Sequence, residues 1–118
     1  MQRCPLAHLY ARSHLANSAR ANDVTLFDAP HFKVSDLEDC RLSTLQAKSL
    51  GIHARAAIHP AQINPIHDAL APTTTEIKNA KAVIAAIEAA DGNVALLDGK
   101  FIEAPVAKKA KNILGLLD

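Results

Sequence analysis

The sequence predicts an α/β fold, and three stretches of the chain support this prediction. Residues 24–58 read as a strand, a helix and a second strand, which is the order of a parallel βαβ unit. The second strand, expected over 54–58, stops at His59-Pro60 because proline has no N–H to give to a sheet. Farther along, Asp98-Gly99 lies between two apolar runs and predicts a tight β-hairpin.

The first element is expected to be an amphipathic helix over residues 6–21. Leucine, alanine and tyrosine recur there at helical spacing among arginine and histidine, and Asn22-Asp23 closes the segment. The run 24–27 is short and rich in β-prone residues, and it ends at Asp28. Two strands therefore end in polar residues, at Asp28 and at His59.

A helix over residues 36–50 connects the two strands. Ser35 and Glu38 have the spacing of a capping box at its start, and Gly51 is placed to end it. A shorter helix over about 61–70 is expected after the second strand. Parallel strands joined in this way normally form a right-handed crossover.

Ala71-Pro72 interrupts this pattern, and a helix, a hairpin and another helix are expected beyond it. Thr73 and Glu76 predict a second capping box at the start of the first of these helices. Pro105 suits the first turn of the last helix. The expected inner faces of the two helices comprise Ile77, Ala80, Val83, Ile84 and Ile87 in the first and Val106, Ala110, Ile113, Leu114 and Leu117 in the second.

Composition excludes several classes of function. The chain has 118 residues, a one-domain length, and 49% of them are hydrophobic. Its net charge of +1 and its 3% aromatic content give no reason to expect a nucleic acid or an anionic membrane as partner. Cys4 and Cys40 match no metal or redox motif and are read as free thiols. Without a signal peptide or membrane span, the expected location is the cytoplasm, with the mitochondrion as the alternative.

Two parallel strands do not make a stable sheet. Parallel strands are normally buried on both faces, inside larger α/β assemblies. An unpaired apolar strand edge also invites association with other chains. The sequence therefore predicts an incomplete domain, whose strands are covered by other copies or by further polypeptide.

Several motifs along nearly the whole chain resemble the C-terminal end of the citrate lyase beta subunit and malyl-CoA lyase family, within the HpcH/HpaI aldolase superfamily. The most specific feature is the combination of an I-H-P motif with a D-G-K-x-I-x-x-P motif about 40 residues later. The matching segments are Tyr10-Ala11-Arg12-Ser13, Ala19-Arg20, the strand end at Asp28, Asp36-Leu37-Glu38, Leu50-Gly51, Ile58-His59-Pro60-Ala61-Gln62-Ile63, Pro72, the helix containing Glu76, and Leu97-Asp98-Gly99-Lys100-Phe101-Ile102-Glu103-Ala104-Pro105-Val106.

This resemblance implies a partial TIM (β/α)8 barrel, formed by its last two strands and their helices, followed by a helix–β-hairpin–helix extension. Residues 1–71 would be the barrel portion, and 72–118 would be a lid or oligomerisation extension. Family members bind Mg²⁺ through a glutamate and an aspartate of upstream strands, and they bind the keto-acid carboxylate through an upstream arginine. Those segments are absent from this chain, so no metal ligand is assigned to it.

The resemblance also implies a reaction and a catalytic residue. Family members cleave a β-hydroxyacyl thioester of coenzyme A or of an acyl carrier to a keto acid and an acetyl thioester. A carboxylate on the C-terminal extension exchanges a proton with the enolate across a subunit boundary. Glu103 occupies that position, where aspartate is usual. The competing interpretation is a carboxylate stabilised by the dipole of the helix that starts at Pro105.

His59, Pro60 and Asp28 are the candidate residues for binding substrate or coenzyme A. His59 could contact a thioester carbonyl or a phosphate, or it could cap the strand end through backbone hydrogen bonds. Asp28 could bind substrate or hold the loop of His59. Asp98-Gly99 is interpreted as a turn only. A solvated helix face is the interpretation of three lysines near the C-terminus, and binding of coenzyme A phosphates is the alternative: Lys108, Lys109 and Lys111. The remaining histidines do not have the spacing of a metal site: His8, His14, His31, His53 and His67.

Three functions follow from these observations. The first is the C-terminal portion of a Mg²⁺-dependent lyase, working as a homo-oligomer or with the missing barrel segment. The second is a non-catalytic module that pairs with a barrel-bearing partner or with its own copies. The third is a truncated remnant without activity. The sequence does not choose among citryl, malyl and citramalyl substrates, because the residues that select the acyl group lie mostly upstream.

Overall fold

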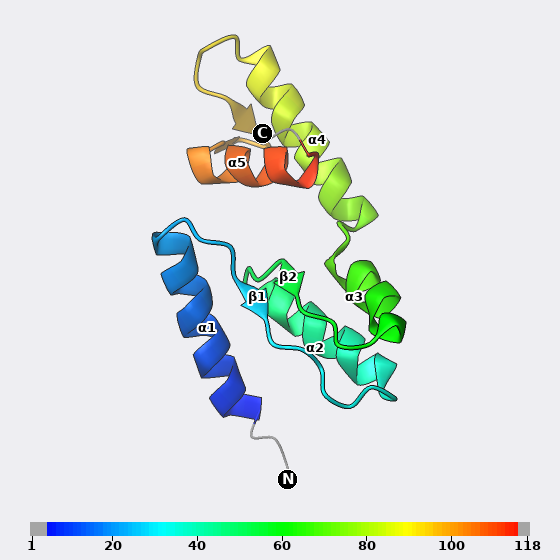
Figure 1. Cartoon of the computed structure of the whole chain (residues 1–118). Helices are drawn as coiled ribbons and strands as arrows, with labels where there is room; N and C mark the ends of the chain where they lie inside the picture. Colours follow the sequence, from blue (N-terminus) through cyan, green and yellow to red (C-terminus); the bar gives the residue numbers. More distant parts are fainter. Residues whose placement is uncertain (1–4, 116–118) are drawn as a thin grey trace. The chain divides into compact units, whose positions relative to one another are not determined.

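The computed structural model describes residues 5–115 as a helix-rich mixture of α and β elements (Figure 1). The chain divides into two compact units, and the boundary lies between Ala71 and Pro72. The described elements are five α-helices, one short 3-10 helix and four strands of two residues each. Two residues named above, Cys4 and Leu117, lie outside the described range.

Helix α1 spans Pro5–Ala21 and ends as the sequence predicts. Asp23 adopts a left-handed conformation, with φ of 52°, just beyond the last turn. The Val24 N–H then donates to the carbonyl of Ala19 at 3.0 Å, which closes the helix end. Polar residues that tolerate the left-handed conformation are frequent at such positions, so the expected stop at Asn22-Asp23 is confirmed.

The two strands of the first unit, β1 (Phe27–Asp28) and β2 (Ala54–Arg55), pair in parallel, as predicted. Both are shorter than the expected 24–27 and 54–58. At the start of β1, Val24 is used in the end of α1. Beyond β2, the Ala56 N–H still donates to the Asp28 carbonyl at 3.2 Å, but the Ile58 N–H donates to the side chain of Gln62 instead of a strand.

Helix α2 spans Leu37–Ser49, and its N-cap differs from the prediction. The capping residue is Asp36, not Ser35, because the Asp36 carboxylate accepts the Asp39 N–H at 3.2 Å. Lys33 donates to the same carboxylate at 2.9 Å, and these two hydrogen bonds hold the pKa of Asp36 below its usual value. The predicted stop is confirmed, since Gly51 has φ of 88° and donates to the Lys48 carbonyl.

The helix expected after β2 is divided into a 3-10 turn, η1 (Pro60–Gln62), and helix α3 (Ile63–Leu70). Helix α3 packs against α2, and this pair contains most of the core of the first unit. That core combines apolar side chains, such as Ile52 and Ile66, with polar ones, and its largest fully buried members are His31, Gln62, Thr44 and Cys40.

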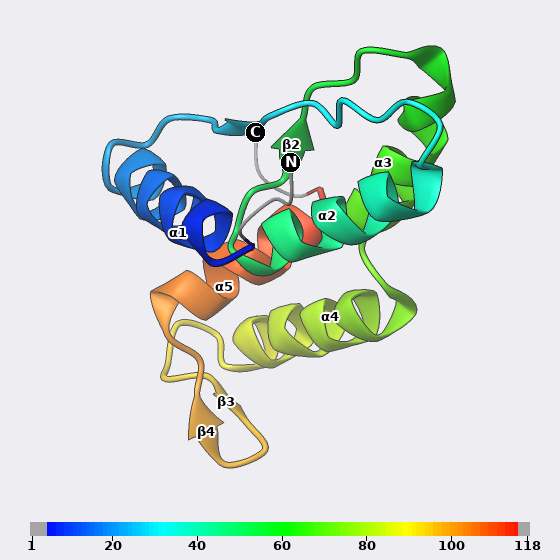
Figure 2. The same ribbon diagram turned by 90° about the horizontal axis from the view of Figure 1, so that it is seen from below.

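The second unit contains helix α4 (Thr74–Ala89), strands β3 (Leu96–Leu97) and β4 (Lys100–Phe101), and helix α5 (Ala104–Ile113). The predicted capping box is present, because the Thr73 side chain accepts the Glu76 N–H while the Glu76 carboxylate accepts the Thr73 N–H. The strands pair in antiparallel fashion through a turn in which Asp98 and Gly99 have φ of 50° and 73°. Figure 2 shows this hairpin extending from the helices.

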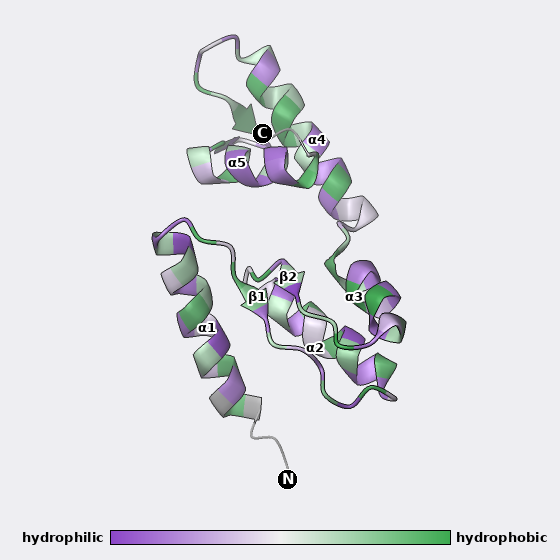
Figure 3. Cartoon of the chain, in the orientation of Figure 1, coloured by the Kyte–Doolittle hydropathy of each residue, from purple (hydrophilic) through white to green (hydrophobic). Residues whose placement is uncertain are grey.

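Helices α4 and α5 pack together over a small apolar core. Ala80 and Val83 of α4 and Ala110 of α5 form its centre, as the helical spacing predicts. The polar residues of α5 are on a hydrophilic face that is visible in Figure 3. The partly buried side chains around the core are Ile84, Ile87, Leu97, Ile102, Ile113 and Leu114.

Many large apolar side chains are exposed. Phe27 on β1 is 64% exposed, and Leu96 and Phe101, which face each other across the hairpin, are 52% and 72% exposed. A stable globular fold normally buries most aromatic side chains, so these positions are candidates for contact with further polypeptide. Among residues 5–115, no helix combines the length and apolar character that a membrane span requires.

Candidate functional site

The candidate site of the first unit lies where β1 and β2 end. Because the strands are parallel, their carboxyl ends share one edge, and Asp28 is paired in register with Arg55. Two loops leave this edge: one follows Asp28, and the other contains His59 and Pro60. In parallel α/β folds, ligands bind at this end of the strands.

The Asp28 carboxylate forms a bidentate ion pair with Arg12 of α1. Arg12 Nη2 lies 2.7 Å from Asp28 Oδ2, and Arg12 Nε lies 3.0 Å from Asp28 Oδ1. A second guanidinium approaches from β2, with Arg55 Nη1 3.7 Å from Asp28 Oδ2. The Asp28 side chain is only 5% exposed. Asp28 therefore ties α1 to the strand ends; its contact with substrate stays a prediction.

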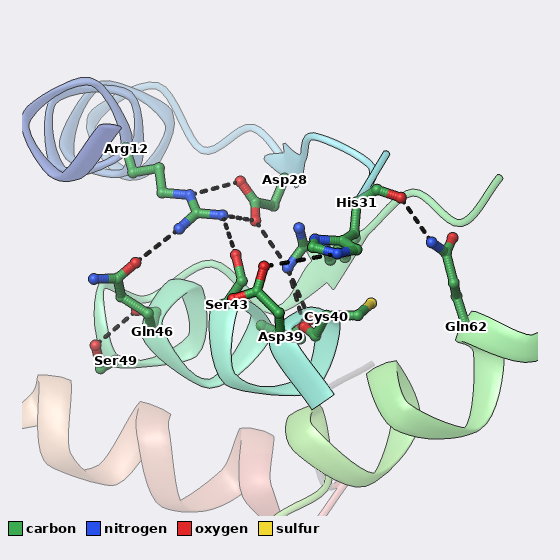
Figure 4. A network of polar contacts seen from close by, with 11 residues as sticks. Arg12, Asp28, His31, Asp39, Cys40, Ser43, Gln46, Ser49 and Gln62 are labelled. Carbon is green, nitrogen blue, oxygen red and sulfur yellow. Dashed lines mark hydrogen bonds and ion pairs between the residues drawn. The ribbon is translucent and has the colours of Figure 1, made fainter. Parts of the chain in front are cut away.

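Helix α2 supplies further partners of both arginines, and Figure 4 shows those of Arg12. Arg12 also donates to Ser43 Oγ and to Gln46 Oε1, both at 3.0 Å. Arg55 donates to the hydroxyl of buried Thr44 at 2.9 Å. The network thus joins α1, β1, β2 and α2 through charge-assisted hydrogen bonds, which are the stronger kind in proteins.

A second polar link connects the two loops at the strand ends. Gln62 Nε2 donates to the carbonyl of His31 at 2.7 Å, and Gln62 Oε1 accepts the Ile58 N–H at 3.0 Å. His31 itself is 1% exposed, and its Nε2 lies 3.7 Å from Asp39 Oδ2. Figure 4 shows Gln62 reaching the His31 backbone from the start of α3.

His59 is exposed and acts as the N-cap of η1. Its Nδ1 accepts the Ala61 N–H at 3.2 Å, and Pro60 occupies the first position of the turn. This is the capping role considered from the sequence. The second ring nitrogen is on the other edge of the imidazole, so a contact with substrate remains compatible with the cap.

Glu103 belongs to the other unit and is the N-cap residue of α5. Its side chain is exposed and makes no capping hydrogen bond with the helix. Pro105 follows in the first turn, as predicted. The carboxylate thus lies at a helix N-terminus, where a negative charge is favoured, without being committed to the cap.

Within residues 5–115, no three His, Cys, Asp or Glu side chains lie close enough together to hold a metal ion. No chemical step on this chain is therefore assigned to a metal. Cys40 is a buried free thiol. The three lysines of α5, Lys108, Lys109 and Lys111, are exposed.

Sequence reasoning did not assign roles to Arg12, Gln62 or Arg55. Arg12 and Gln62 occur inside the motifs on which the family resemblance rests. A polar side chain inside such a motif is the sequence feature that could have marked these two residues as structurally important. The side chains that accept hydrogen bonds from Arg12 lie 16 to 34 residues away in the sequence, and His31 lies 31 residues from Gln62. Periodicity does not report contacts of that separation.

Comparison with known proteins shows homology to citrate lyase beta subunits. The chain is 34% identical over 111 residues to citrate lyase subunit beta of Leuconostoc mesenteroides subsp. cremoris, covering 92% of this chain and 37% of that protein. It is 34% identical over 89 residues to (3S)-malyl-CoA thioesterase of Cereibacter sphaeroides, covering 73% of this chain and 31% of that protein. No family model matches the sequence.

The fold is also found in a solved structure. The protein CitE from Mycobacterium tuberculosis, in complex with magnesium, acetoacetate and coenzyme A, matches 97% of this chain and 42% of its own, with a TM-score of 0.72 and 24% identity. The chain therefore spans well under half of the proteins it resembles.

Proposed function

We propose, from the premise that this chain is a member of the citrate lyase beta subunit family, that it supplies the C-terminal part of a carbon–carbon lyase active site. The substrate class is a β-hydroxyacyl thioester, of the citryl, malyl or citramalyl type, carried on coenzyme A or an acyl carrier. The observation that carries the proposal is 34% identity over 92% of the chain. The metal ligands would come from segments outside this chain.

In this proposal, β1 and β2 are the last two strands of a (β/α)8 barrel. Each strand of a closed barrel pairs with a neighbour on both sides, whereas β1 and β2 pair only with each other among residues 5–115. The exposed Phe27 on β1 agrees with an element that packs against more polypeptide. The unit 72–118 would then be the extension that completes the site, in a homo-oligomer or with the missing barrel segment.

The reaction divides the catalytic work between the chain and the absent segments. The substrate hydroxyl loses its proton to a base supplied elsewhere and becomes the carbonyl of the keto acid. The electrons of the broken carbon–carbon bond pass to the acetyl thioester as an enolate. The segments outside this chain would hold Mg²⁺, and that ion would supply Lewis-acid polarisation of the keto-acid oxygen. Glu103, in its protonated form, gives its proton to the enolate carbon and becomes a carboxylate.

Three features of this chain support these roles. Glu103 is exposed and makes no capping hydrogen bond, so its carboxyl group is available to a ligand. His59 is exposed at the strand end, where parallel folds bind substrates. Asp28 is committed to Arg12 and would keep the strand ends in place.

The test is a chimeric enzyme in which this chain replaces the homologous segment of a citrate lyase beta subunit. Glu103→Gln should lower kcat by about 10²-fold or more, because general acid catalysis contributes 10²- to 10⁴-fold. Glu103→Asp, which restores the usual family residue, should stay active. Glu88→Gln changes an exposed glutamate of α4 and is the matched control. Undiminished turnover in the Glu103→Gln chimera would sink the catalytic role.

The alternative, a non-catalytic module that pairs with a barrel-bearing partner or with itself, is favoured by the exposed hairpin pair Leu96 and Phe101. It predicts that replacing both residues with serine weakens association in analytical ultracentrifugation. It also predicts that Glu103→Gln changes neither association nor any activity of the assembled protein. The lyase proposal predicts loss of turnover for Glu103→Gln with association unchanged.

A further inference from the structure

Gln62 is a polar residue with no exposed surface, which requires an explanation. Its amide donates to the carbonyl of His31 and accepts the N–H of Ile58. These groups belong to the loops that leave β1 and β2. We propose that Gln62 is a positioning residue that fixes the loop of His59, so that His59 presents its Nε2–H outward as a hydrogen-bond donor.

The loop needs such a link because the sheet has ended. Ala56 makes the last ladder hydrogen bond, to the carbonyl of Asp28. On the β1 side, Pro30 follows two residues after Asp28 and has no N–H to continue the ladder. An amide side chain is the group that can donate to the His31 carbonyl and accept from Ile58 at the same time. Methionine has a similar size but offers neither group.

The held loop then determines the state of the His59 ring. Pro60 has no N–H, so the first backbone donor available at the start of η1 is Ala61. That N–H donates to His59 Nδ1, which must therefore carry a lone pair and no proton. In a neutral imidazole the remaining proton is on Nε2. The edge of His59 that faces away from the cap offers a donor and not an acceptor.

This inference deepens the proposed function and rests on it in one respect only, namely that the donor would meet an oxygen of the substrate. The geometry of Gln62 and the protonation of the His59 ring belong to the free chain. They can be measured without substrate, metal or partner, so a failure here is distinguishable from an inactive chimera.

The experiment is nuclear magnetic resonance on the full-length chain labelled with ¹⁵N and ¹³C, at about pH 8. The expected result for the wild type is an unprotonated Nδ1 and a protonated Nε2 on His59. Scalar couplings across hydrogen bonds are expected between the Ile58 nitrogen and the Gln62 Cδ, and between Gln62 Nε2 and the His31 carbonyl carbon.

Two variants test whether Gln62 acts on His59. Gln62→Met should make the Ile58 amide exchange with solvent about tenfold faster and give His59 a mixture of both tautomers. Gln62→Glu keeps an acceptor for Ile58 but faces a buried carboxylate towards the His31 carbonyl, and should disturb the loop at least as much as Gln62→Met. Asn79→Met, which replaces an exposed amide side chain of α4 in the other unit, is the control and should change neither measurement.

Three results would overturn the inference. A wild-type His59 protonated on Nδ1 would contradict the tautomer, and absent couplings would contradict the Gln62 link. A Gln62→Met chain that is less stable but keeps the wild-type His59 tautomer would reduce Gln62 to a packing role. If that variant does not fold, the wild-type tautomer and couplings decide the question.

Discussion

The buried ion pair between Arg12 and Asp28 gives the sharpest prediction about stability. In Arg12→Gln, the Asp28 carboxylate loses both hydrogen bonds from the guanidinium, at 2.7 and 3.0 Å. The side chains are 16% and 5% exposed, so water replaces these bonds poorly. Breaking a buried pair costs about 3–5 kcal/mol, and Arg55, 3.7 Å from the carboxylate, places the expected cost near the lower limit.

A loss of about 3 kcal/mol corresponds to a factor of about 10² in an equilibrium constant. The assay is amide hydrogen exchange of Cys40 and Thr44, which are buried in α2. Their protection factors should fall by about that factor in Arg12→Gln. Asp28→Asn should also destabilise, and the double variant should lose less than the sum of the single losses.

The matched control is Arg41→Gln. Arg41 pairs with Glu38 on the surface of α2, with the arginine and glutamate side chains 39% and 65% exposed, and such pairs contribute little. Its protection factors should stay close to those of the wild type. If Arg12→Gln behaves like Arg41→Gln, the claim that the Arg12–Asp28 pair holds the strand ends is refuted.

Three further predictions concern the ends of helices and the hairpin. Thr73→Ala removes the capping box of α4 and should destabilise the second unit by about 1 kcal/mol. The measurement is hydrogen exchange of the α4 amides, and unchanged protection of these amides would contradict a stabilising role of the capping box. The hydrogen bond from Lys33 is the main cause that lowers the pKa of Asp36 in the folded chain. The ionised Asp36 therefore stabilises α2 fully above the pKa of the unfolded chain, about 3.9, and this stabilisation is lost as the pH falls through the lower pKa of the folded chain. The first turn of α2 should therefore unwind in acid by circular dichroism and exchange, and Asp36→Asn, which still caps, should remove this pH dependence. Gly99→Ala forces a side chain into a φ of 73° and should weaken the hairpin by about 1–2 kcal/mol, whereas unchanged β3–β4 cross-strand contacts in nuclear Overhauser spectra would argue against strain there.

Local signals in the sequence predicted the second unit well. The Thr73–Glu76 capping box and the Asp98-Gly99 turn both depend on residues within a few positions of each other. The helix start at Asp36 was missed because Ser35 and Asp36 are both good N-caps, and the contacts of Asp36 with the Asp39 N–H and with Lys33 appear only in the folded chain. The strand lengths were overestimated because propensity does not show where a partner strand ends.

The candidate site was predicted less completely. The sequence identified Asp28 and His59 by their places at strand ends, and the family resemblance identified Glu103. It did not show that Asp28 is paired with Arg12 or that Gln62 joins two loops, because these contacts depend on tertiary packing across distant segments. The burial of His31, Gln62 and Thr44 was also unexpected, since polar residues are normally placed outside a core.

The most direct test of the central claim is thioester cleavage measured side by side for the purified chain and for the chimera. Citryl, malyl and citramalyl thioesters would be supplied with and without Mg²⁺, and the keto acid and acetyl thioester products would be quantified by mass spectrometry. We predict cleavage by the chimera with Mg²⁺ and none by the chain alone. Turnover by the chain alone, or a folded chimera that cleaves none of the three substrates, would contradict the claim that this chain completes a lyase site whose metal ligands lie elsewhere.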